Sequence, residues 1–357
     1  MNILITESPS ENGYIESLIN AYTRAGHTVI CDVNNFYFSG YMPDILHIHW
    51  PERLYKWHSL ESIGGVDIYK TIKERLLWYK EKGTKIIHTI HNLNPHDSNH
   101  AFEEDIYQLI IEYADILVHH CNDSINFIID RCSDASQKIN IVCPHGDYLI
   151  HYKIIDQSHA RQQYNIPSEK IVILNFGKQR PYKNENFIKT VIKDLECTSK
   201  YLLVAGRFEN PGGNSSSRLY FRARNRIRKQ FEYSKQRYIY RQIPTDEIPA
   251  ILCSSDIVFL GQQHGLNSGL LSLAATYSKP VVCPDIGCFH ASLSGWNHET
   301  YNAGNIADAV RALDKMCARV IEIKKEAASF DNSLWLTKHS WDRHVKNILL
   351  NASGNRP

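Results

Sequence analysis

Residues 256–285, "DIVFLGQQHGLNSGLLSLAATYSKPVVCPD", contain in order an apolar run, a polar turn, a helical pattern and a second apolar run. The first run, Ile257–Leu260, and the run that begins at Val281 are typical of buried strands, and Lys279-Pro280 separates the helix from the second. A strand, a helix and a strand in this order predict a parallel βαβ unit. The helix begins near Asn267, where unpaired N–H groups and a partial positive charge suit an anion.

The same alternation of strands and helices runs through both halves of the chain. It begins with "NILIT" and "SENGYIESLINAYTRAG", breaks around residues 147–168, and restarts with "KIVILNFG". This pattern predicts an α/β protein with two doubly wound, Rossmann-like domains, at residues 1–160 and 165–330, and a final helix within 331–357. We expect the two domains to face each other across a cleft, with ligands at the carboxyl ends of the strands.

The composition is that of an ordinary globular protein. The chain has 357 residues, of which 43% are hydrophobic and 22% charged, and its formal net charge is +2. Nine cysteines without a CxxC pair indicate reduced thiols rather than a disulfide framework. The first residues do not resemble a secretory signal, and no apolar run reaches the roughly 18–20 residues that span a bilayer. We therefore expect a cytoplasmic protein, with attachment to a membrane surface left open.

Two motifs in the second half suit a phosphorylated ligand. "NFGKQRPYKN", residues 175–184, follows a buried-type strand and delivers Lys178, Arg180 and Lys183 in one loop. Several charge-assisted donors at close range are what a diphosphate requires. A solvated basic loop is the alternative explanation.

The second motif is the start of the helix in the opening stretch. Asn267 and Ser268 carry side-chain donors, and Gly269 allows a ligand to approach the backbone. A plain N-cap explains these residue types equally well. The presence of both motifs in one predicted domain favours a bound phosphorylated ligand.

These motifs, together with two in the first half, resemble a known family. The basic loop, the "NSG" turn that leads to "KPVVCPD", and the N-terminal "HIHW" and "HTIHNLNPHD" are similar to nucleotide-sugar-dependent glycosyltransferases of the GT-B fold. The similarity covers most of the chain. It extends to bacterial enzymes that build capsules, O-antigens and exopolysaccharides, including a group related to the xanthan glucuronosyltransferase.

The resemblance implies how a donor is bound. The large retaining group of this fold has a Gly-Arg pair and a Lys six positions after the Gly; Gly177 and Lys183 match it, with Lys178 in place of Arg. That group also has two Glu, but Gly265 and Leu273 occupy their positions here, so the donor must be held differently. The implied co-substrate is a nucleoside diphosphate sugar of the UDP or GDP type, with no other cofactor and no metal ion.

Candidates for the general base lie in the first half. His91 matches a histidine that many GT-B enzymes place against the donor sugar, and Pro95 stiffens the loop that carries His96 and Asp97. Any of the three could remove the proton of the acceptor hydroxyl, although His96 and Asp97 would also serve as caps of the next helix. Glu7 and Glu52 are the alternative bases. Gly13, in the turn after the first strand, is expected to allow close approach of donor or acceptor, with Tyr14 beside it.

Residues 218–242 form the strongest outlier in composition, because basic and aromatic residues alternate there with a single acid. Three explanations fit this composition: the segment forms a solvated helix, it binds an anionic membrane surface, or it binds nucleic acid. We do not expect binding to nucleic acid.

The resemblance implies transfer of a hexosyl residue to a saccharide or lipid-linked saccharide acceptor in cell-surface polysaccharide synthesis. The N-terminal domain takes the acceptor, the C-terminal domain takes the nucleotide sugar, and the final helix packs back on the first domain. Such an enzyme works in the cytoplasm or at the inner face of the cell membrane. The alternatives are a GT-B sugar-nucleotide epimerase and a catalytically decayed protein that binds membrane or polyanion.

Overall fold

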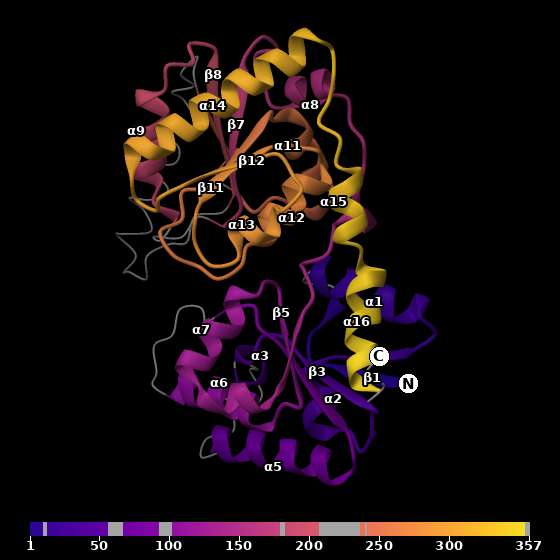
Figure 1. Ribbon diagram of the computed structural model, residues 1–357. Coiled ribbons are helices and arrows are strands. Elements are labelled where there is room, and N and C mark those ends of the chain that lie inside the picture. Colours follow the sequence, from indigo (N-terminus) through magenta and orange to yellow (C-terminus); the bar gives the residue numbers. More distant parts are fainter. Residues whose placement is uncertain are drawn as a thin grey trace, which may run out of the picture. The chain divides into compact units, whose positions relative to one another are not determined.

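The computed structural model describes residues 1–9, 13–55, 67–92, 102–178, 183–206, 236–239 and 241–353. The chain divides into two compact units (Figure 1). Unit 1 comprises Met1–Ile150, Gly265–Asn267 and Thr337–Pro357, and unit 2 comprises His151–His264 and Ser268–Leu336.

Unit 1 is built on a parallel six-stranded sheet of order β2-β1-β3-β4-β5-β6. Its strands are β1 (Asn2–Ile5), β2 (Thr28–Cys31), β3 (Ile45–Ile48), β4 (Lys85–Thr89), β5 (Ile116–His119) and β6 (Ile139–Val142). The central strands are buried on both faces and are therefore rich in Ile, Leu and Val. The strand order reverses between β1 and β3, and in such sheets ligands bind at the carboxyl edge beside this reversal.

Helices cover both faces of this sheet. One face packs against α1 and α16, with Leu18, Trp341 and Ile348 in the shared core, and the other packs against α2, α3, α5 and α6. The helices of unit 1 are α1 (Gly13–Arg24), α2 (Val33–Phe38), α3 (Glu52–Tyr55), α5 (Ile68–Glu81), α6 (Phe102–Tyr113), α7 (Asp123–Arg131) and α16 (Trp341–Ala352), with 3-10 turns η2 (Ser133–Gln137) and η3 (Leu149–His151).

Unit 2 contains a second parallel six-stranded sheet, of order β12-β11-β10-β7-β8-β9. Its strands are β7 (Ile171–Phe176), β8 (Lys200–Ala205), β9 (Gln236–Ile239), β10 (Ile257–Phe259), β11 (Val281–Pro284) and β12 (His298–Tyr301). The order reverses between β7 and β10. The predicted α/β class with two parallel, doubly wound sheets is confirmed.

Helices also cover both faces of the second sheet. α9 and α14 share one core with it, while α11, α12, α13 and α15 share the other. The helices of unit 2 are α8 (Gln157–Gln163), α9 (Glu185–Asp194), α11 (Ile248–Ser254), α12 (Gly269–Thr276), α13 (Phe289–Ser292), α14 (Ile306–Lys325) and α15 (Ser333–Lys338), with the 3-10 turn η5 (Thr245–Glu247). The alternation predicted from the sequence ends at Asp285, whereas the structure continues with β12 and the long helix α14.

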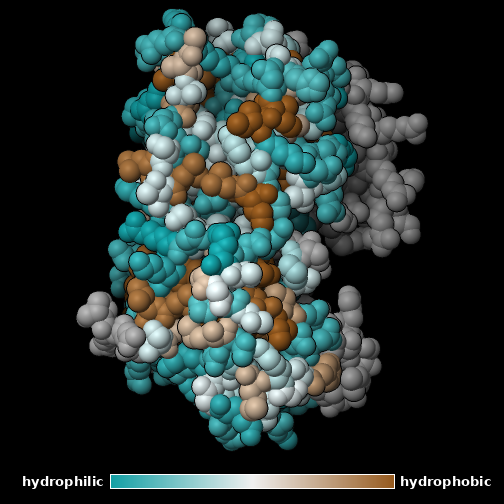
Figure 2. Space-filling view, turned by 90° about the vertical axis from the view of Figure 1, so that its right-hand side faces the viewer, coloured by the Kyte–Doolittle hydropathy of each residue, from teal (hydrophilic) through white to brown (hydrophobic). Residues whose placement is uncertain are grey.

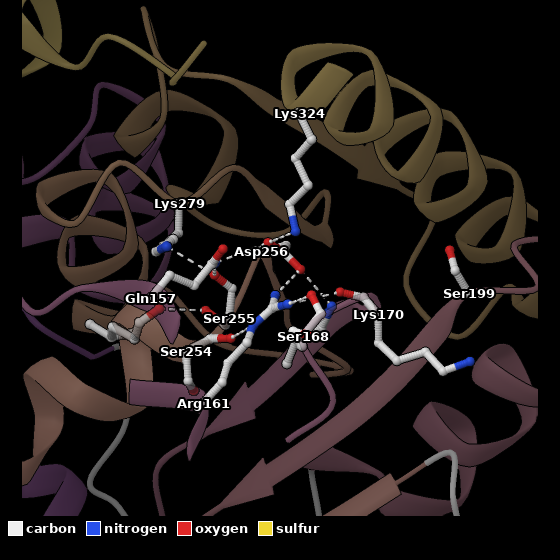
Figure 3. Close-up of polar contacts among 12 residues, drawn as sticks. Gln157, Arg161, Ser168, Lys170, Ser199, Ser254, Ser255, Asp256, Lys279 and Lys324 are labelled. Carbon is white, nitrogen blue, oxygen red and sulfur yellow. Dashed lines mark hydrogen bonds and ion pairs between the residues drawn. The ribbon is translucent and has the colours of Figure 1, made fainter. Parts of the chain in front are cut away.

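A buried ionic network, which we call the Asp256 network, ties the helices of unit 2 to its sheet. Asp256 precedes β10, and its carboxylate accepts hydrogen bonds from Arg161 Nη2 at 2.6 Å, from Lys324 Nζ at 2.6 Å and from the backbone N–H of Val172 at 2.7 Å. Figure 3 shows Arg161 and Lys324 converging on this carboxylate. Asp256 and Arg161 expose only 2% and 3% of their side chains, so the two charges are paired inside the unit.

In the described part of the chain, no helix is both long enough and apolar enough to span a bilayer. The face drawn in Figure 2 is mainly hydrophilic, with apolar patches between. Among the exposed apolar side chains, Ile154 stands out with 81% exposure.

Candidate functional site

In unit 1, a group of histidines lies at the carboxyl edge of the sheet. Tyr14 follows Gly13 at the start of α1, and its ring is only 2% exposed. The ring centroids of five histidines lie 4.8–6.4 Å from that of Tyr14, all in edge contacts; they are His49, His91, His120, His145 and His344. We call these five residues the histidine cluster. Tyr14 is thus the packing centre of the cluster.

Within the cluster, His91 is held from three sides. Trp50 stacks on its ring with centroids 4.0 Å apart and planes 14° apart, and Tyr14 meets it edge-on at 4.8 Å. His91 Nε2 is hydrogen-bonded to His49 Nδ1 at 3.1 Å. The backbone is fixed as well, since Asn267 Nδ2 donates to the carbonyl oxygens of Ile90 and His91 at 3.2 and 3.0 Å. The structure thereby brings His91 and Asn267 together within unit 1.

In unit 2, the basic loop follows β7. Gly177 has a φ of 98°, a left-handed conformation that favours glycine. Lys183 Nζ donates to the carbonyl oxygen of Phe176 at 3.3 Å, which folds the lysine back over the end of β7. Gly206 is required beside it, because a Cβ there would lie 2.0 Å from the carbonyl oxygen of Gly177. Lys178 is exposed next to Gly177.

The loop after β10 lies against this basic loop. A Cβ at Gly261 would lie 2.6 Å from Ile188 Cγ1 and 3.1 Å from the carbonyl oxygen of Lys183, so only glycine allows this approach. The same loop leads to Ser268, the N-cap of α12, whose side chain makes no capping hydrogen bond to the helix, and to Gly269, its first residue. Both phosphate-suited motifs therefore follow neighbouring strands at the reversal of strand order between β7 and β10.

Comparison with known proteins agrees with this architecture. No family model matches the chain. A GDP-mannose:glycolipid 4-beta-D-mannosyltransferase of Xanthomonas campestris pv. campestris is 24% identical over 281 residues, which cover 78% of this chain and 72% of that protein. The sucrose-phosphate synthase of Thermosynechococcus elongatus superposes with a TM-score of 0.69 at 12% identity, covering 99% of this chain and 98% of the other. Anabaena HepE, in complex with UDP and glucose, gives a TM-score of 0.69 at 14% identity, with coverages of 99% and 100%.

The chain has the GT-B fold of these glycosyltransferases. The relatives named here are transferases and synthases, as the motif resemblance predicted, and none is an epimerase.

Burial determines the charge state of the histidines in the cluster. Desolvation, followed by the charges of neighbouring histidines, holds the pKa values of His49 and His91 well below the usual 6.5. Burial also lowers the pKa values of His145 and His344 to about 4. The cluster is therefore neutral at physiological pH, and a neutral imidazole has one ring nitrogen free to accept a proton.

The other candidate bases have different surroundings. Glu7 is buried and pairs with Arg53 Nε at 3.2 Å. Glu52 is buried and accepts a hydrogen bond from the Tyr107 hydroxyl. Both carboxylates are thus engaged by neighbours within unit 1.

Three of the predicted site residues, His96, Asp97 and Arg180, lie outside the described residues, and so does most of the basic segment 218–242. In the described ranges, no group of three or more His, Cys, Asp or Glu side chains is placed to hold a metal ion.

Sequence reasoning missed His120, His145 and His344 as neighbours of His91. The signal was present, because histidines occur at the carboxyl ends of four successive strands, in "HIHW", "HTIH", "LVHH" and "CPHG". Side chains at the carboxyl ends of parallel strands gather at one edge of the sheet. His344 carried no such signal, since it comes from α16, at the far end of the chain.

Proposed function

We propose that this protein is a glycosyltransferase, which transfers a hexosyl residue from a nucleoside diphosphate sugar to a saccharide or lipid-linked saccharide in the synthesis of cell-surface polysaccharide. In this proposal unit 2 binds the donor and unit 1 binds the acceptor. The observation that carries it is the contact of the two phosphate-suited loops through Gly261, at the point in the sheet of unit 2 where α/β folds bind ligands.

The leaving group is the diphosphate. We assign Lys178, Arg180 and Lys183 to its oxygens, where charge-assisted hydrogen bonds are strong. Ser268 and Gly269, at the start of α12, add a hydroxyl and a backbone N–H. As the bond to the anomeric carbon breaks, negative charge grows on the diphosphate, and fixed cationic donors stabilise that charge.

The acceptor hydroxyl needs a base. We assign this role to His91, a buried neutral imidazole at the carboxyl edge of the sheet of unit 1, with His96 and Asp97 as the neighbouring candidates. Gly13, at the start of α1 on the same edge, allows a substrate to approach the backbone, and Asn267 anchors the backbone of His91.

The relatives guide the choice of substrates. The Xanthomonas relative is named for GDP-mannose and a glycolipid, and HepE was crystallised with UDP and glucose. GDP and UDP sugars are therefore the donors to test first, and a glycolipid is the first acceptor. A glycolipid acceptor also supports a location at the inner face of the cell membrane, where segment 218–242 would contact anionic lipid.

Titration calorimetry with GDP and UDP tests the donor site. Lys183→Ala should weaken nucleotide binding by about 10- to 100-fold, because it removes one charged hydrogen bond to phosphate. Lys189→Ala is the matched control, since Lys189 lies on α9 in an ion pair with Glu185 and should leave affinity unchanged. Equal affinities in both variants would place the phosphate elsewhere, and failure of the wild type to bind either nucleotide would favour the decayed site.

Transfer itself is measured by incubating the enzyme with GDP-mannose or UDP-glucose and a glycolipid acceptor, and by following the glycolipid product by mass spectrometry. Flotation with liposomes, with and without anionic lipid, tests the membrane contact. Binding that ignores lipid charge would make segment 218–242 a solvated helix.

A further inference from the structure

The hydrogen bond between His49 and His91 limits what His91 can do. It occupies Nε2 of His91, so Nδ1 is the only ring nitrogen that remains for a substrate. In the described part of the chain, Nδ1 of His91 makes no hydrogen bond, and the residue retains 7% exposure. A base must present an unprotonated nitrogen, so the position of the single ring proton decides whether His91 can act.

The surroundings of His49 favour one arrangement. His49 is 1% exposed, and its Nε2 has no hydrogen-bond partner among the described residues. The rings of His47, at 4.2 Å, and Tyr14, at 5.5 Å between centroids, enclose His49 instead. Nδ1 is therefore the nitrogen of His49 that a described partner engages, and a proton on Nε2 of His49 leaves this Nδ1 as an acceptor.

We propose that His49 is a positioning residue for His91: its Nδ1 accepts the Nε2–H of His91 and thereby keeps the Nδ1 lone pair of His91 free for the acceptor hydroxyl. This inference rests on the proposed function, because it assigns His91 to the acceptor. In the reaction, the O–H bond of the acceptor breaks, its proton binds to Nδ1 of His91, the acceptor oxygen bonds to the anomeric carbon, and the bond from that carbon to the diphosphate oxygen breaks.

The rest of the site supports this step. Trp50, stacked on His91, stabilises the imidazolium that forms when the proton arrives, since an aromatic face attracts a cation. Among the described residues, the titratable groups that face the pair are Tyr14 from α1 and other histidines from the strands, the strand ends and α16; the histidines are His47, His88, His120, His145 and His344. These groups are neutral at neutral pH, so none of them competes as a fixed charge with the hydrogen bond for the proton.

Nitrogen-15 NMR of the imidazole rings tests the proton position directly and does not require catalysis. In the wild type, His91 should have its proton on Nε2 and a bare Nδ1, with the signal assigned by its loss in His91→Asn. His49→Phe removes the acceptor, and His91 should then populate the opposite tautomer. Wild-type His91 with its proton on Nδ1 would overturn the proposal, whatever the enzyme transfers.

Kinetics then separates positioning from packing. His49→Phe should lower kcat roughly a hundredfold, the range for loss of a positioned base, with little change in the KM of the donor. His49→Asn retains an acceptor oxygen near the place of Nδ1 and should restore most of kcat.

The matched control is His47→Asn. His47 lies in β3, two residues before His49, and is equally buried, but it bonds to Tyr22 and Thr89 instead of His91 and should leave kcat near the wild-type value. A loss of kcat in His49→Asn as large as that in His49→Phe would reduce His49 to a packing role. Nucleotide binding without transfer in the wild type would count against the proposed function but leave the NMR result to decide the hydrogen bond.

Discussion

Each of the two units contains a set of buried polar side chains, and the two sets are built in opposite ways. The Asp256 network of unit 2 is charged, and its carboxylate is matched by donors from Arg161, Lys324, Gln157 and the backbone of Val172. The histidine cluster of unit 1 is neutral, and the Nε2 atoms of its members His49, His120 and His344 have no hydrogen-bond partner among the described residues.

This difference indicates which of the two sets maintains the fold and which is a candidate functional site. A buried network in which the donors and acceptors are matched fixes helices to a sheet and leaves nothing for a ligand. A buried cluster with unmatched nitrogens lowers stability, and such a cost is expected where a site must bind or react. The Asp256 network lies before β10, at the amino edge of its sheet, whereas the histidine cluster lies at the carboxyl edge, where α/β folds bind ligands.

Acidification should produce the largest effect, and it should act on unit 1. Burial lowers the pKa of His47 to about 3 and those of His88, His145 and His344 to about 4, against 6.5 in the unfolded chain. Between pH 6.5 and pH 4 the unfolded chain binds more protons, so stability is complete above pH 6.5 and falls as the pH is lowered, by about 1.4 kcal/mol per pH unit for each histidine.

Differential scanning calorimetry at pH 7, 6 and 5 measures this loss. The unfolding transition of unit 1 should move to lower temperature much more than that of unit 2. His344→Gln should reduce the dependence of the stability on pH by the contribution of one histidine. Two transitions that shift together would mean that the histidine cluster does not distinguish the units.

Breaking the Asp256 network should produce the next largest effect. Asp256→Ala leaves the buried Arg161 without its counter-charge, and we expect a loss of about 3–5 kcal/mol in the free energy of unfolding, measured by urea titration. The double variant Arg161→Met, Asp256→Ala should lose less than the sum of the single variants, because it also removes the unpaired charge. Additive losses would show that the pair is not coupled.

The smallest effect should come from an exposed ion pair. Arg24 and Asp342 join α1 to α16 in unit 1 with 2.6 Å between Nη2 and Oδ1, but their side chains are 57% and 70% exposed. Asp342→Ala should cost less than about 1 kcal/mol, and raising the salt concentration should shrink the difference further. A loss as large as that of Asp256→Ala would contradict the distinction between buried and exposed charges.

Much of the fold could be predicted from the sequence. Short apolar runs followed by amphipathic helices specify parallel α/β units, because a strand buried on both faces must be apolar throughout. The helix over Gly13–Arg24 and the strand–turn–helix–strand order of residues 256–285 appear in the structure as predicted. The long helix α14 was missed, although its apolar residues Ala309, Leu313, Met316 and Val320 follow helical spacing.

The candidate site was only partly predictable. The basic loop and the start of α12 could be placed at one sheet edge, because each follows a strand of the same sheet. Their contact through Gly261 and Lys183, and the strand order that makes β7 and β10 neighbours, could not. His91 was a candidate because it matches a histidine of GT-B enzymes, but its stacking on Trp50 depends on two segments that are distant in sequence.

The sequence by itself determined the secondary structure, the α/β class and the residue types available for phosphate and proton chemistry, since these follow from local periodicity and from the chemistry of single side chains. Only the tertiary structure decided the order of the strands, which ring nitrogen of His91 is occupied, and which polar groups are matched. These properties depend on hydrogen bonds and ring contacts between residues far apart in the chain. Such contacts form only when the helices and the sheet bury their apolar faces together.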